Sequence, residues 1–173
     1  DRRVTRRLWR VARLVERRLA ALASGAEAVF AHVPSEAYHL TIVNRTHYGE
    51  DAKVSALSRE EAEEARRIVR RQSRGALALQ FHGLIVSRAG LLLAPGYPAN
   101  DDFYDLRARL AQEMPVLQKH LPGMAHLKLG HVLVPLAGGP LHELLCWLRA
   151  CGELVNARLV FHDLYTPHGR IEL

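Results

Sequence analysis

The sequence lacks several features that would place it in a common class. It has only two cysteines, Cys146 and Cys151, with no CxxC motif, so we expect buried thiols and neither a disulfide framework nor a zinc site. No GxGxxG or GxxxxGK(S/T) motif supports a dinucleotide or P-loop site. No apolar run approaches the roughly 20 residues that span a bilayer. We therefore expect no transmembrane segment and a cytoplasmic location, although the chain opens with Asp1 and a segment preceding it is left open.

Metal-ligand spacing is also lacking. No HxH, HxxH or HxxxE pattern surrounds His39. His131 follows His126 by five residues, so a regular strand would turn these two side chains to opposite faces. We interpret His131 as a structural or surface residue. Neither a metal ion nor a cofactor is expected.

Positive charge is abundant and uneven. The formal net charge is +6 and the isoelectric point is near 9.8. Residues 1–18 hold eight arginines against Asp1 and Glu16, so this segment alone accounts for the whole net charge. Such a surface attracts RNA, nucleotides or acidic membranes. The alternative is that the arginines only solvate the outer face of a helix.

Hydrophobic periodicity predicts alternating helices and strands. Residues 1–24 form an Arg-rich amphipathic helix in this interpretation, and Ser58 opens a second helix through a capping box with Glu61. The further predicted elements are strands at 28–33, 38–43, 125–134 and 156–164, a hairpin over 76–94 that turns at 88–90, and helices at 101–120 and 141–151. We expect residues 1–173 to form one α+β domain, a two-lobed, pseudo-symmetric fold of sheets and helices with a central cleft.

Two short segments share one pattern. His39-Leu40-Thr41-Ile42 and His126-Leu127-Lys128-Leu129 both read histidine, apolar, polar, apolar. In a strand, the period of two sends the histidine and the polar residue to one face and both apolar residues to the other. Each segment can therefore anchor in a core and present two polar side chains to a cleft.

Two opposed histidines suit phosphodiester chemistry. One group must take a proton from the attacking oxygen and another must give a proton to the leaving oxygen, and imidazole titrates close to neutral pH. Thr41 can donate a hydroxyl hydrogen bond to the same phosphate, and Lys128 a charge-assisted one. These donors would stabilise the negative charge of the transition state.

The paired motifs resemble the two-histidine phosphoesterase superfamily, which includes RNA 2',3'-cyclic phosphodiesterases, also called 2'-5' RNA ligases. YHLTIVN resembles the first motif and AHLKLGHVLV the second, in which Lys128 replaces the family's Thr or Ser. The segment ALALQFHGLIVSRAGLLLAPGYPANDDFYDLRARLAQEM resembles the hairpin and helix between the motifs, and NARLVFHDLYTPHGRIEL the closing strand and tail. The resemblance implies this fold and a metal-independent phosphodiesterase with His39 and His126 as the catalytic pair.

The predicted partner is therefore RNA or a nucleotide with a phosphodiester or cyclic phosphate. Tyr165, in the tail, is a candidate for base stacking, with a plain surface tyrosine as its alternative. A rival interpretation is a catalytically weak RNA- or nucleotide-binding module that keeps the cleft but has lost efficient turnover because of Lys128. A third is an interaction domain whose Arg-rich helix docks on a partner or an acidic membrane.

Overall fold

The structure, a computed structural model, has a mixed α+β architecture. It describes residues 2–23, 25–43, 57–73, 75–117, 124–166 and 168–173. The chain divides into two compact units. The first comprises the described residues of Asp1–Leu40, Gln80–Tyr97 and Met124–Leu159, and the second those of Thr41–Leu79, Pro98–Gly123 and Val160–Leu173. The units do not follow the two passes of the sequence, because both histidine motifs begin in the first unit.

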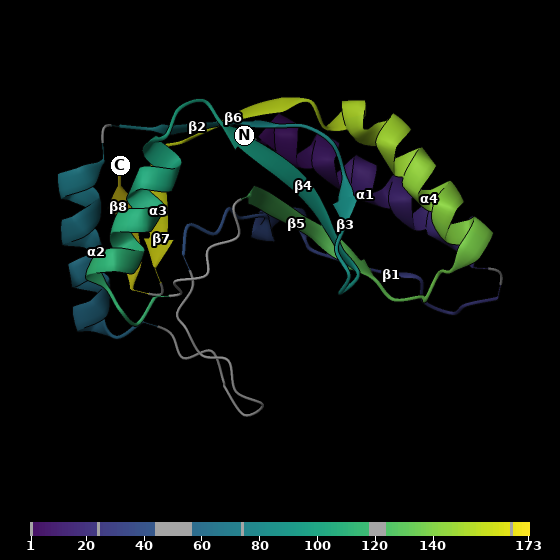
Figure 1. Ribbon diagram of the computed structural model, residues 1–173, viewed down its shortest axis with the longest axis horizontal. Coiled ribbons are helices and arrows are strands. Elements are labelled where there is room, and N and C mark those ends of the chain that lie inside the picture. Colours follow the sequence, from purple (N-terminus) through teal and green to yellow (C-terminus); the bar gives the residue numbers. More distant parts are fainter. Residues whose placement is uncertain (1, 24, 44–56, 74, 118–123, 167) are drawn as a thin grey trace. The chain divides into compact units, whose positions relative to one another are not determined.

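The main sheet is antiparallel wherever its pairing is described, and its strands lie in the order β1-β5-β4-β2-β6, with β3 beside β4 (Figure 1). Strands β1, β3 and β5 lie wholly in the first unit. The strand bounds are β1 (Phe30–His32), β2 (Leu77–Phe81), β3 (Ile85–Val86), β4 (Leu91–Pro98), β5 (Ala125–Val132) and β6 (Ala157–Phe161).

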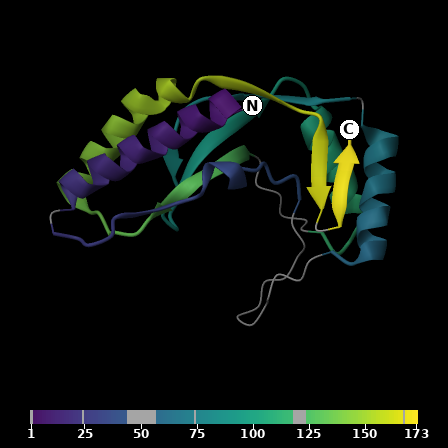
Figure 2. The ribbon, with the colours of Figure 1, turned by 180° about the vertical axis from the view of Figure 1, so that it is seen from behind.

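Helices α1 (Arg2–Leu22) and α4 (Gly138–Cys151) pack side by side in the first unit, and α1 also contacts β5 (Figures 1 and 2). The predicted apolar stripe of α1 is the packed face, because Leu8, Val11, Val15 and Leu19 are all at most 3% exposed. Each such burial contributes about 1.5–3 kcal/mol. The short helix η2 (Gly152–Val155) follows α4 directly.

The first histidine motif is not a strand, contrary to our prediction for residues 38–43. After β1 the chain forms a short 3-10 helix, η1 (Ser35–Ala37), and returns to the sheet through one bridge, Leu40 to Leu127. In the β1–β5 register, His32 pairs with Gly130. The bridge at Leu40 is offset from that register, so the chain around η1 bulges out of the sheet edge. Pro34 favours this break because its ring leaves no N–H for a ladder.

A second irregularity lies in β5. The β4–β5 register shifts between Leu92 and Leu93, so Leu92 pairs with Gly130 and Leu93 with Lys128. Leu129 is fully buried, and a Cβ added at Gly130 would meet the buried ring of Phe30, so two consecutive residues face the helix side. Beyond this bulge the alternation is inverted.

His131 is therefore on the other face from the one we predicted. It pairs with the exposed residue Ala31 and lies on the same side of β5 as His126 and Lys128. The prediction assumed an uninterrupted strand. The bulge between His126 and His131 adds one residue, which inverts the alternation of side chains beyond it.

The second unit contains helices α2 (Arg59–Gln72) and α3 (Asp102–Glu113), which pack together, and the hairpin β7 (Asp163–Thr166) and β8 (Gly169–Glu172) (Figure 2). The predicted capping box is present: the Ser58 hydroxyl accepts from the Glu61 amide, and the Ser58 amide donates to the Glu61 carboxylate. This unit corrects two predictions. α3 ends at Glu113 because Pro115 holds the preceding backbone extended, and the tail is a two-strand hairpin in addition to β6.

Candidate active site

Within the first unit, the structure brings His39 and Leu40, the first half of one motif, beside the second motif. Leu40 pairs antiparallel with Leu127. In an antiparallel register the residue before one partner stands opposite the residue after the other, so His39 stands opposite Lys128. His126 is then the diagonal neighbour of His39, a relation in which the separation is roughly 7–8 Å. Two imidazoles at this spacing can address one phosphate between them.

Both imidazoles are held in the same way. Nδ1 of His39 lies 2.9 Å from the carbonyl oxygen of Ala37, and Nδ1 of His126 lies 3.4 Å from that of Met124. In each case the partner is the carbonyl two residues earlier, and a carbonyl can only accept. Each Nδ1 therefore donates its hydrogen, which leaves Nε2 as the nitrogen that can exchange a proton. The two histidines thus share a backbone contact as well as a sequence pattern.

The second motif alternates as predicted along β5. Ala125, Leu127 and Leu129 are buried, whereas His126 is half-buried and Lys128 is exposed. We call the side of the sheet that carries His126 and Lys128 the distal face, since α1 packs on the other side.

The distal face is bordered on β4 by apolar residues. Leu93 stands opposite Lys128 and Pro95 opposite His126, and both are buried. Tyr97, two residues further along β4, shares this face and is 54% exposed. An apolar border beside a cation and an imidazole raises the strength of electrostatic contacts made there.

Thr41 is the first residue of the second unit, where its backbone is tightly held. Arg107 of α3 donates from Nε to the Ile42 carbonyl at 2.7 Å and from an η nitrogen to the Thr41 carbonyl at 3.1 Å. Arg107 is only 4% exposed, its guanidinium lies 4.5 Å from the Phe103 ring centre, and burial lowers its pKa. The arginine thus fixes the backbone that carries the predicted phosphate donor.

The sequence did not reveal Arg107 or the carbonyls of Ala37 and Met124 as contacts of the candidate site residues. The arginine carried a signal, because it occupies the same helical stripe as the buried residues Phe103, Leu106 and Leu110. A cation at such a position indicates specific partners. The two carbonyls could not be predicted from the sequence, since every residue has a backbone carbonyl.

Tyr38, which precedes His39, is half-buried, whereas His39 is exposed. Its hydroxyl is buried and has no hydrogen-bond partner among the described residues. Burial raises the pKa of Tyr38 to about 12.

Two further residues bear on our predictions. Tyr165 is 77% exposed on β7 of the second unit, opposite Arg170. Cys146 is exposed, contrary to the predicted burial, and its sulfur lies 3.5 Å from Nε2 of His142. Base stacking by Tyr165 stays a prediction.

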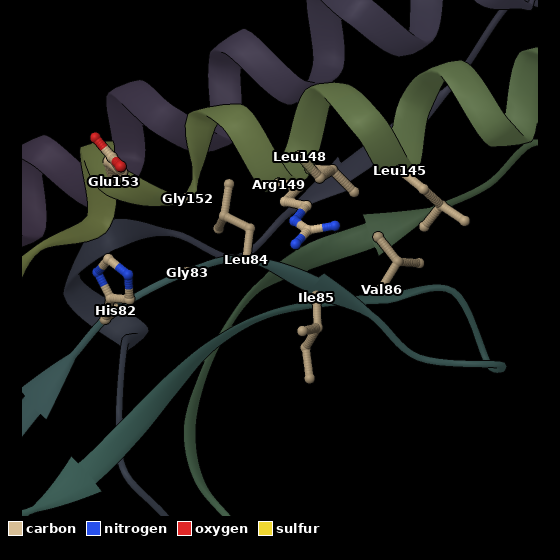
Figure 3. Close-up of a pocket in the computed structure, with 10 residues that line it drawn as sticks. All are labelled: His82, Gly83, Leu84, Ile85, Val86, Leu145, Leu148, Arg149, Gly152 and Glu153. Atoms are coloured by element: carbon tan, nitrogen blue, oxygen red, sulfur yellow. The ribbon is translucent and has the colours of Figure 1, made fainter.

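An open pocket of about 450 Å³ lies elsewhere in the first unit, between β3 and α4 (Figure 3). Leu84, Ile85 and Leu148 contribute apolar surface, and the Arg149 guanidinium extends from α4 toward β3. Neither candidate histidine lines this pocket, so it is separate from the paired motifs.

Over the described ranges, no three histidine, cysteine or acidic side chains are grouped closely enough to hold a metal ion. Within the same ranges, no helix combines the length and the apolar character that crossing a membrane requires. Comparison of the sequence with protein-family models gave no match, and comparison with curated proteins gave none either.

Proposed function

We propose that the protein is a metal-independent phosphodiesterase or cyclic phosphodiesterase that acts on RNA ends or small nucleotides. The observation that carries this proposal is the matched anchoring of His39 and His126 on neighbouring stretches of one sheet. Both rings keep Nε2 for proton exchange, which is what a base and an acid on one phosphate require.

The chemistry needs only these side chains and water. A neutral Nε2 takes the proton of the attacking water or ribose hydroxyl as its oxygen bonds to phosphorus. The protonated Nε2 of the other histidine gives its proton to the departing ribose oxygen as the P–O bond breaks. Lys128, opposite His39 in the register, and the Thr41 hydroxyl would stabilise the charge that develops on the phosphoryl oxygens.

The test is hydrolysis of a 2',3'-cyclic nucleotide in the presence of EDTA. We expect turnover by the full chain, and a loss of roughly 10²- to 10⁴-fold for His39→Ala and for His126→Ala, because each removes one proton transfer. His131→Ala is the matched control, since it removes a histidine from the same face of β5, five residues from His126 and beyond the bulge.

Three results would contradict the proposal. They are a lack of hydrolysis, activity that EDTA abolishes and a divalent ion restores, or equal losses in all three histidine variants. Nucleotide binding without hydrolysis would favour the second candidate, a binding module. The observation that favours this candidate is Lys128 itself, a lysine on the exposed side of β5 that can hold an anionic product.

A further inference from the structure

Five arginines of α1 lie along one side of the helix. Arg2, Arg6, Arg10, Arg13 and Arg17 follow one another at intervals of three or four residues. At about 100° per residue they fall within an arc of roughly 80°, and at 1.5 Å per residue they extend over about 22 Å. We call these five residues the α1 arginine stripe.

The stripe points away from the protein because the opposite side of α1 is its packed side. Leu8, Val11, Val15 and Leu19 lie across the helix from the stripe and are at most 3% exposed. A helix that lies in a membrane surface needs its apolar face for the acyl chains. In α1 that face is already buried in the first unit, so only the arginines and their flanks are open to a partner.

Most of the stripe has no counter-charge. Arg13 forms an ion pair with Glu16 at 2.7 Å and lies over the Trp9 ring. Across the described residues, no carboxylate pairs with the other four members. The nearby partners serve arginines off the stripe: Arg18 pairs with Glu143, and Arg7 donates to the Asn156 carbonyl.

The arrangement costs stability in the free protein. Like charges spaced by four residues on a helix destabilise it by about 0.2–0.5 kcal/mol per pair, and Arg2–Arg6, Arg6–Arg10 and Arg13–Arg17 are three such pairs. A bound polyanion would offset the repulsion between these arginines, because each of them would be attracted to its negative charges. Trp9, at the edge of the stripe and 40% exposed, adds an aromatic surface on which a base can stack.

We propose that the α1 arginine stripe binds the phosphate backbone of a nucleic acid strand. Arginine matches phosphate geometry with two parallel hydrogen bonds, and a row of arginines follows a row of phosphates. The surface is distinct from the candidate active site, because α1 packs against the side of β5 opposite the distal face. It therefore goes beyond the proposed function and does not depend on it.

The experiment measures binding of a fluorescein-labelled RNA strand of about twelve nucleotides, ending in a 3'-hydroxyl, at several salt concentrations. The test variant carries Arg6→Gln, Arg10→Gln and Arg17→Gln. The matched control carries Arg59→Gln, Arg67→Gln and Arg70→Gln, three arginines of helix α2 that are also exposed. Glutamine has a helix propensity similar to that of arginine, and each variant loses three positive charges.

For the test variant we expect weaker binding and a slope of log affinity against log salt that is shallower by about 2, since each lost phosphate contact contributes about 0.7 for a single strand. The control should keep the wild-type slope. Circular dichroism confirms that both variants fold.

Equal changes in the two variants would overturn the proposal, because net charge alone would then explain binding. Lack of RNA binding by the wild type would overturn it as well. Vesicles containing an anionic phospholipid form the last arm: binding to vesicles but not to RNA, lost in the test variant, would assign the stripe to a membrane surface instead.

Discussion

At the residue scale, Lys128 is where the second motif differs from the first. It is exposed on the distal face and stands opposite His39, with Leu93 on its other side. A charged donor there forms hydrogen bonds to phosphate that are about twice as strong as those of a neutral hydroxyl. The position leaves the buried residues Leu127 and Leu129 untouched, so a substitution there reports on the site and not on the fold.

We expect Lys128→Thr to weaken the binding of nucleoside monophosphates without changing the unfolding midpoint. Calorimetric titration of wild type and variant measures the affinity. The cyclic-nucleotide assay is the companion readout: a rise in turnover would mean that Lys128 holds product or repels the protonated His126. Unchanged affinity together with unchanged turnover would remove Lys128 from the site.

Tyr38 gives a prediction about alkaline pH. Its folded-state pKa of about 12 lies above the ordinary value of 10.0 because burial disfavours the phenolate. The unfolded chain therefore loses this proton first as pH rises. The stability associated with the neutral phenol is complete below pH 10 and is lost as pH rises toward 12.

Tyr38→Phe should remove that loss. At neutral pH the variant should equal the wild type or exceed it by about 1 kcal/mol, since a buried hydroxyl without a partner is replaced by a hydrogen. Denaturant unfolding from pH 8 to 11.5, compared with Tyr165→Phe at an exposed tyrosine, checks both statements. A wild-type stability that falls with pH no faster than that of Tyr38→Phe would contradict the assignment.

At the element scale, the sequence predicted regular pieces well and irregular ones poorly. The apolar stripe of α1, the capping box of α2, the turn at 88–90 and strand β5 were confirmed, because each follows from local periodicity or a turn residue. The first strand of the predicted hairpin over 76–94 is divided into β2 and β3, and only β3 pairs with β4 across that turn. The single bridge at Leu40 and the bulge at Leu129 were not predicted. Both depend on how two distant segments pair, which local propensity does not encode.

These irregularities shape the site. The interruption around η1 supplies the Ala37 carbonyl that anchors His39, and the bulge brings His131 onto the distal face. The residue pattern predicted His39, Lys128 and His126 on one polar face, and the burial of alternate residues along β5 confirms this for His126 and Lys128. The pattern could not supply their register, because register is a property of the pair of strands.

At the scale of the whole molecule, the first unit carries two polar surfaces on opposite sides of its sheet. One is the distal face with His126 and Lys128, next to the Leu40 bridge, and the other is the α1 arginine stripe. The net positive charge is concentrated in the second of these, so overall charge alone does not report on the proposed catalytic site. Mutations of the two surfaces should act independently, as expected for separated sites.

The central claim is that His39 and His126 address one phosphate. Its most direct measurement is an NMR titration of the histidine side-chain nitrogens with inorganic phosphate, assigned with single histidine variants. We predict that both rings are protonated on Nδ1 when neutral, and that the Nε2 signals of His39 and His126 shift together along one saturation curve while His131 does not follow it. Separate curves for the two rings, or a response of only one, would contradict the claim.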